Sequence, residues 1–141
     1  MSTIAANIAQ RSTVETARNV ADLAGRIFLA TLFLLSGLGK IGAYSGTAAY
    51  MAALGVPAAL LPVVIVTEVA GAAAIVAGWQ TRITALLLAG YSLLTALIFH
   101  DNFANQIEMI MFLKNVSIAG GFLILVANGP GSLSLDRKLG R

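Results

Sequence analysis

The chain has 141 residues, enough for one domain, and 58% of them are hydrophobic while only 11% are charged. About a quarter of the residues in a soluble domain are charged, so this composition excludes an ordinary water-soluble protein and favours a chain surrounded by lipid. The sequence has no cysteine and one histidine. This excludes disulfides, thiolate chemistry, iron–sulfur ligation and any site built from several histidines of one protomer.

Four apolar runs follow one another, and each is close to the ~20 residues that a helix needs to cross a bilayer. In chain order they cover residues 20–41, 58–78, 81–99 and 107–127. The runs are too long for strands and lack the alternation of strands, so they predict helices. Charged residues precede the first run, which predicts an uncleaved first span rather than a signal peptide. We therefore predict an all-α fold, a four-transmembrane-helix up-down bundle, flanked by segments 1–19 and 128–141.

The connections between the spans are short. Residues 46–54 predict a short interfacial helix between the first two spans, because tyrosines nearby suit the membrane interface. Pro57 and Pro62 suit the first turn of the second helix, where a missing N–H costs little. A tight turn at residues 79–81 and a loop at residues 100–106 complete the predicted hairpins.

Lysine and arginine predict the orientation of the bundle. Lys40 alone flanks one end of the spans. The other end carries seven basic residues: Arg11, Arg18, Arg26, Arg82, Arg137, Lys138 and Arg141. This bias predicts that the N- and C-termini are cytoplasmic. The net charge of +3 is thus interpreted as a topology signal, and no nucleic-acid partner is expected.

Ionisable residues inside spans are the candidates for function, because they are costly in lipid. Glu68 lies near the middle of the second span, and Lys114 lies about one helical turn away in depth in the fourth. Three interpretations remain open for these two residues: a buried ion pair that fixes helix register, a ligand or proton site, and unpaired side chains facing a water-filled crevice. Arg26 either snorkels to the headgroups or pairs with Glu68.

A polar mouth is expected above Glu68, at the end of the bundle opposite the termini. The residues expected to form it are Lys40, His100, Asp101, Glu108 and Asn115. His100 is either a solvated cap or a group that exchanges protons near neutral pH. The small residues Ser36, Gly37 and Gly39 predict close helix packing. No catalytic residue and no metal-binding pattern is identified.

Four short motifs resemble those of a known family. They are R-x10-G-x2-K ending at Lys40, E-x2-G beginning at Glu68, K-N-x4-G-G beginning at Lys114, and G-P-G-S-L-S-L-D ending at Asp136. Their order and spacing resemble the DoxX family of small bacterial inner-membrane proteins, in its YphA-like group. The resemblance implies a four-helix protein of the bacterial cytoplasmic membrane. It also implies a link to redox enzymes, since some relatives are the small subunit of a thiosulfate:quinone oxidoreductase and others act in oxidative-stress defence.

Two functions of different classes follow as hypotheses, and whether the protein is an enzyme stays open. The first is a redox-associated subunit that binds a quinone or similar lipid-soluble carrier with Glu68, Lys114 and His100. The alternative is a non-catalytic membrane partner that holds a soluble oxidoreductase through a basic tail with Arg137, Lys138 and Arg141. A small transporter working as a homo-oligomer is the last hypothesis.

Overall fold

The computed structural model describes the backbone of residues 2–140 and the side chains of residues 8–140. Over these residues the chain forms helices and connections, without a strand. The elements in order are α1 (Ser2–Gly42), α2 (Tyr44–Ala53), the 3-10 helix η1 (Ala58–Leu60), α3 (Leu61–Ala77), α4 (Thr81–Phe99), α5 (Gln106–Asn128) and the short α6 (Leu135–Lys138).

Four of these helices are long and apolar enough to cross a membrane: residues Ile8–Gly42, Ala58–Ala77, Thr81–Phe99 and Gln106–Asn128. The predicted all-α four-span fold is therefore confirmed, and the last three spans agree with the predicted bounds to within one residue. The first helix differs, because it continues without a break from Ser2 rather than starting near residue 20. The predicted helix over residues 46–54 is also present, as α2.

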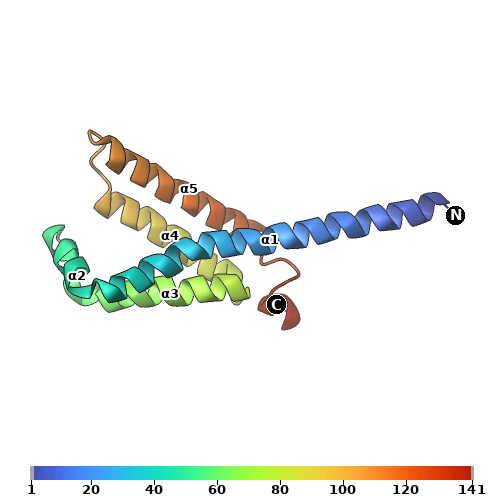
Figure 1. Cartoon of the computed structure of the whole chain (residues 1–141), viewed down its shortest axis with the longest axis horizontal. Coiled ribbons are helices and arrows are strands. Elements are labelled where there is room, and N and C mark those ends of the chain that lie inside the picture. The colour runs from blue at the N-terminus through green and yellow to red at the C-terminus, as the bar shows by residue number, and fades with distance from the viewer. Residues whose placement is uncertain (1, 141) are drawn as a thin grey trace.

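The spans form an up-down bundle in which α1 packs along α3 and α4 packs along α5. Contact between α3 and α4 joins the two pairs. Figure 1 shows the α4–α5 pair diverging from α1 and α3 toward the end that holds α2, which we call the α2 end. Both termini lie at the opposite end, which we call the tail end (Figure 1). The cytoplasmic location of the tail end stays a prediction.

The core between the spans is built largely from alanines and a few large side chains. Phe33, Ile75, Leu88 and Phe122 fill it, at 5%, 0%, 2% and 0% exposure. Many other large apolar side chains face outward instead, among them Phe28, Leu35, Leu87, Leu97 and Ile124. Small residues allow the helices to approach closely, and an apolar exterior suits lipid, which does not penalise it as water does.

The tail end is closed by Arg26, which is buried at 1% exposure. Its Nη1 donates to the carbonyl oxygens of Ile75 at 3.3 Å and Val76 at 3.1 Å, in the last turn of α3. Its Nη2 donates to the Leu133 carbonyl in the tail. The last carbonyls of a helix lack partners within it, and a cation is favourable there. Both predictions for Arg26 are therefore wrong: it neither snorkels nor pairs with Glu68.

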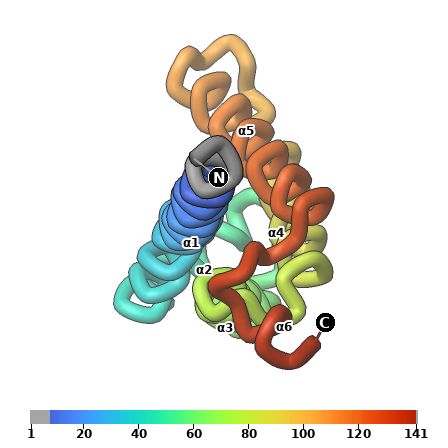
Figure 2. The backbone as a smooth tube through the Cα atoms, turned by 90° about the vertical axis from the view of Figure 1, so that its right-hand side faces the viewer, coloured from blue at the N-terminus to red at the C-terminus, as the bar shows by residue number. Residues whose placement is uncertain are grey.

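Asp136 attaches the tail to the start of α4, as Arg26 attaches it to the end of α3. Its two carboxylate oxygens accept from the backbone N–H groups of Gln80 and Thr81, each at 2.8 Å, and so cap the first turn of α4. Its own N–H donates to the Gly78 carbonyl at 2.9 Å. Figure 2 shows the chain after α5 crossing the tail end to place α6 beside α3. Arg141, counted in the predicted basic tail, lies outside the described residues.

We predict that Gly78→Ala destabilises the protein more than Gly55→Ala. Both glycines have positive φ, +69° and +76°, so both substitutions incur a conformational cost of about 1–2 kcal/mol. A Cβ at Gly78 would also overlap Arg26 and Ser134, whereas nothing lies within 4 Å of a Cβ at Gly55. Thermal unfolding in mild detergent measures the difference. Equal midpoints for the two variants would show that the tail does not pack against this turn.

Candidate functional site

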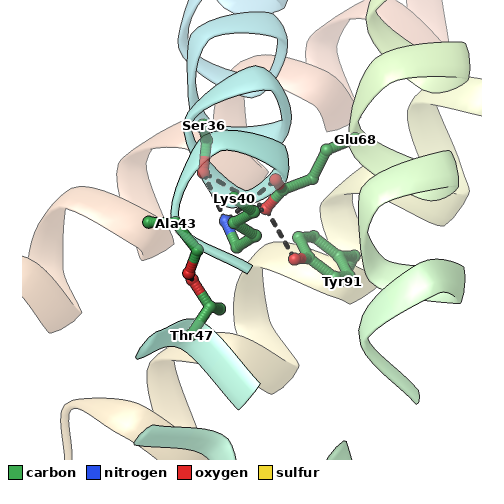
Figure 3. Close-up of polar contacts among 6 residues, drawn as sticks. All are labelled: Ser36, Lys40, Ala43, Thr47, Glu68 and Tyr91. Carbon is green, nitrogen blue, oxygen red and sulfur yellow. Dashed lines mark hydrogen bonds and ion pairs between the residues drawn. The ribbon is translucent and has the colours of Figure 1, made fainter. Parts of the chain in front are cut away.

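The candidate site is centred on Glu68, in the middle of α3, where the residue is 3% exposed. Its carboxylate accepts hydrogen bonds from side chains of two other helices (Figure 3). Lys40 Nζ of α1 lies 2.9 Å from both Oε1 and Oε2. The Tyr91 hydroxyl of α4 donates to Oε1 at 2.7 Å, and Ser36 Oγ of α1 donates to the same oxygen at 3.3 Å. We call Ser36, Lys40, Glu68 and Tyr91 the Glu68 network.

The geometry of α1 explains why two of its residues reach Glu68 together. Ser36 and Lys40 are four residues apart, so they lie on the same face of the helix. Lys40 Nζ also donates to Ser36 Oγ at 2.6 Å, which orients the ammonium group toward α3. Gly37 lies between them and faces α3, where a Cβ would be 2.7 Å from Val69 Cγ2. The absence of a side chain at Gly37 thus lets α1 come close enough for the ion pair to form.

An isolated charge in a membrane interior is unfavourable by roughly 2.5–3.5 kcal/mol on insertion scales. Pairing Lys40 with Glu68 offsets this cost, and two hydroxyl donors complete the arrangement. The donors are unevenly distributed over the carboxylate. Three donors converge on Oε1, whereas Lys40 is the one donor to Oε2 among the described side chains. Glu68 Oε2 therefore keeps capacity to accept a further hydrogen bond.

The predicted ion pair between Glu68 and Lys114 is wrong. Lys114 is exposed on α5, and its Nζ contacts Met111 Sδ at 3.0 Å. The prediction matched the two residues by depth alone, but α5 packs against α4 while α1 packs along α3. Lys40, predicted to lie above Glu68 in the polar mouth, supplies the cation because its long side chain reaches down from the end of α1.

A cavity of about 400 Å³ opens beside the Glu68 network, toward the α2 end. Its walls are mostly apolar and come from all four spans and from α2. The apolar lining includes Leu32, Phe33, Met51, Leu60, Val64, Leu94, Ile98 and Phe99. Tyr50 of α2 lines it too and stacks on Phe99 of α4, with ring centroids 5.8 Å apart. This stacking joins α2 to the cavity wall, so α2 covers part of the space between the two helix pairs.

The cavity brings together five of the six predicted site residues. Lys40, Glu68, His100, Lys114 and Asn115 all line it, and Arg26 at the tail end does not.

The rest of the predicted polar mouth is arranged around His100, whose Nδ1 lies 2.7 Å from Glu108 Oε2. This contact links the end of α4 to the first turn of α5. Asp101 and Glu108 are not among the lining residues. The Asn115 amide donates to the Met111 carbonyl at 3.0 Å, so its own oxygen is available for another partner. The cavity therefore has a second polar region on α5, apart from the Glu68 network.

Sequence reasoning missed two members of the Glu68 network. Tyr91 is a hydroxyl-bearing residue in the middle of an apolar span, which was a usable signal, because such a group needs a partner in lipid. Ser36 was interpreted only as a packing residue. Its spacing of four from Lys40 places both on one helix face, and this spacing was the available signal.

We predict that Gly37→Ala lowers stability while Gly39→Ala does not. A Cβ at Gly37 would lie 2.7 Å from Val69 Cγ2 and 3.2 Å from Glu68 Cβ, so α1 and α3 would have to separate. Such overpacking costs about 1–3 kcal/mol. Nothing lies within 4 Å of a Cβ at Gly39, two residues along the same helix, where alanine should be neutral or slightly stabilising. Thermal unfolding in mild detergent compares the two, and equal losses of stability would contradict the close approach at Gly37.

Comparison with known proteins agrees with this architecture. The DoxX family model matches residues 21–101, more than half of the chain. The chain is 50% identical to inner membrane protein YqjF of Escherichia coli strain K12, across 87% of this chain and 95% of that protein. It is 44% identical to inner membrane protein YphA of the same strain, across 86% of this chain and 92% of that protein. No solved structure matches it.

The relatives and the four apolar spans together make this a multi-pass protein of the bacterial inner membrane, in contact with the lipid bilayer. The residues matched by the family model include two of the four motifs, the one that ends at Lys40 and the one that begins at Glu68. The chain belongs to the DoxX family.

Proposed function

We propose that this protein is a redox-associated membrane subunit that binds a quinone, or a similar lipid-soluble carrier, in the cavity beside the Glu68 network. The observation that carries the proposal is the meeting of an ammonium, a carboxylate and a phenol on one wall of an otherwise apolar cavity. Its volume of about 400 Å³ falls within the usual range for small-molecule sites.

The chemistry of the network suits both forms of a quinone. The oxidised ring carries two carbonyl oxygens that accept hydrogen bonds. Lys40 and Tyr91 donate to Glu68 in the structure, and in this proposal a donor of each turns from Glu68 to the ring when the ligand binds. The reduced ring carries two hydroxyl groups that donate, and Glu68 Oε2 has room to accept. A carboxylate that takes a proton from a quinol hydroxyl, or returns one to a quinone oxygen, acts as an acid–base group at the ring. Reduction needs two electrons and two protons; in this proposal a partner oxidoreductase supplies the electrons.

The polar region on α5 supports a ligand with two polar ends. Lys114 Nζ has a thioether as its hydrogen-bond partner, and sulfur is a weak acceptor. The oxygen of Asn115 is also available. In this proposal one ring oxygen binds at the Glu68 network and the other binds near Lys114 and Asn115. Apolar side chains between these two regions contact the ring, and the isoprenoid tail leaves into the bilayer.

We expect Tyr91→Phe to weaken binding of a short-chain ubiquinone by about tenfold, because the substitution removes one hydrogen-bond donor to the ring. The hydrogen bond that the same hydroxyl donates to Glu68 Oε1 in the structure is lost as well. Tyr44→Phe is the matched control, since it removes the same hydroxyl from an exposed tyrosine that does not line the cavity. Isothermal titration of purified protein in lipid nanodiscs measures the affinity. The control should bind as the unmodified protein does.

Unchanged affinity in Tyr91→Phe would overturn the placement of the ring beside the Glu68 network. Absence of binding to the unmodified protein would overturn the quinone proposal itself. In that case Glu68 is better explained as part of a structural ion pair between α1 and α3.

The second candidate is a non-catalytic membrane partner for a soluble oxidoreductase. It is favoured by α1, whose residues 8–18 are all exposed and extend beyond the bundle at the tail end (Figure 1). Arg137 and Lys138 are exposed at the same end. Unmodified protein that binds no quinone, yet retains a soluble oxidoreductase when purified in mild detergent, would favour this candidate over the first.

A further inference from the structure

A second cavity, of about 790 Å³, lies at the tail end and takes no part in the proposed quinone site. Its walls come from the amino-terminal part of α1, the α3–α4 turn, the end of α5 and the tail. Three arginines line it, one from each of three separate segments: Arg18 in α1, Arg82 in α4 and Arg137 in α6. None of the three guanidinium groups has an ion pair or a side-chain hydrogen bond within residues 8–140.

Three carboxylates also line this cavity, as many as the arginines, but none of them forms an ion pair with Arg18, Arg82 or Arg137 within residues 8–140. Asp136 holds the backbone N–H groups of Gln80 and Thr81, so the first turn of α4 is already capped by the protein. Asp22 lies against the tail, where a Cβ at Gly131 would be 2.8 Å from its Oδ2. Glu15 is exposed on α1. The N–H donors of the three guanidinium groups are thus available to a ligand of the cavity.

The turn after α5 brings the backbone close to Arg82. Gly129 has a φ of +81°, and a Cβ there would lie 3.3 Å from Arg82 Nη2 and 3.4 Å from Nε. A residue without a side chain therefore lets the chain pass beside the planar guanidinium. A guanidinium presents parallel N–H donors that fit two oxygens of one phosphate group, which a lysine cannot do.

The position of the cavity indicates where such a phosphate would come from. Thr81, Arg82 and Asn128 line it at the ends of two predicted spans, the level at which lipid headgroups lie. Ile83 lines it as well and is 61% exposed on the apolar exterior of α4. A ligand in this cavity can therefore contact the three arginines and also the lipid-facing surface of α4.

We propose that this cavity binds the phosphate group of an anionic phospholipid through Arg18, Arg82 and Arg137. The headgroup lies among the guanidinium groups, and the acyl chains follow the apolar surface beyond Ile83. Basic pockets at the ends of transmembrane helices have this chemistry in general. Because the same segments hold the tail, bound lipid would also stabilise the closed tail end.

The test compares two variants that lose the same charge. Arg18→Gln/Arg82→Gln removes two cations from the cavity, and Arg11→Gln/Lys138→Gln removes two exposed cations that do not line it. Delipidated protein in a neutral detergent is titrated with phosphatidylglycerol and followed by native mass spectrometry. We expect the cavity variant to bind about tenfold more weakly, and the control variant to bind as the unmodified protein does.

A second arm of the experiment separates lipid from free phosphate. Inorganic phosphate at millimolar concentration should not displace the phospholipid, because it lacks the acyl chains. Displacement by phosphate would overturn the lipid assignment. Equal loss of affinity in the two variants would overturn the cavity as the site, since it would show a general effect of charge. Circular dichroism of both variants confirms that each is folded as the unmodified protein is.

Discussion

The ion pair between Lys40 and Glu68 is the interaction on which the architecture of the α2 end depends. The Glu68 carboxylate is 3% exposed in the middle of an apolar span, so it requires a cation and further donors from the protein itself. The cation comes from α1 and the carboxylate from α3, so these helices must lie close together. Gly37 makes this approach possible, and Tyr91 of α4 brings the second helix pair to the same carboxylate. The Glu68 network thus fixes three spans relative to one another and forms a polar wall beside the cavity.

The two ends of the bundle are built on different physical principles. At the tail end, Arg26 satisfies the last carbonyls of α3 and Asp136 satisfies the first N–H groups of α4, so the chain is held by its own backbone. At the α2 end the helix pairs diverge, and polar side chains line a cavity (Figure 1). The contacts of Arg26 and Asp136 hold the spans together at the tail end, so a ligand can enter between the helix pairs at the α2 end without separating the whole bundle.

The sequence predicted the fold well because its signals are local. The length and composition of each apolar run define a span, and residues such as Gly78 and Pro57 lie where helices end or begin. The course of α1 before residue 20 was not predicted as part of the helix, because its polar residues carry no span signal. Side-chain partners were harder, since they depend on which helices pack together. Similar depth in the membrane suggested Lys114 as the ion-pair partner of Glu68. The partner in the structure is Lys40, because α1 and not α5 packs along α3. The predictions for Arg26 were wrong because its partners are backbone carbonyl oxygens, and no residue type in the sequence marks which carbonyls will lie near it.

A double-mutant cycle on Lys40→Met and Glu68→Gln tests the central claim most directly, with unfolding followed in mild detergent. Removing one partner of a buried pair leaves the other uncompensated and costs about 3–5 kcal/mol, whereas removing both costs less than the sum of the single substitutions. We predict a coupling energy above about 1 kcal/mol for this pair, and coupling below about 0.5 kcal/mol between Lys114→Met and Glu68→Gln. Additive effects of Lys40→Met and Glu68→Gln, or stronger coupling of Glu68 with Lys114, would contradict it.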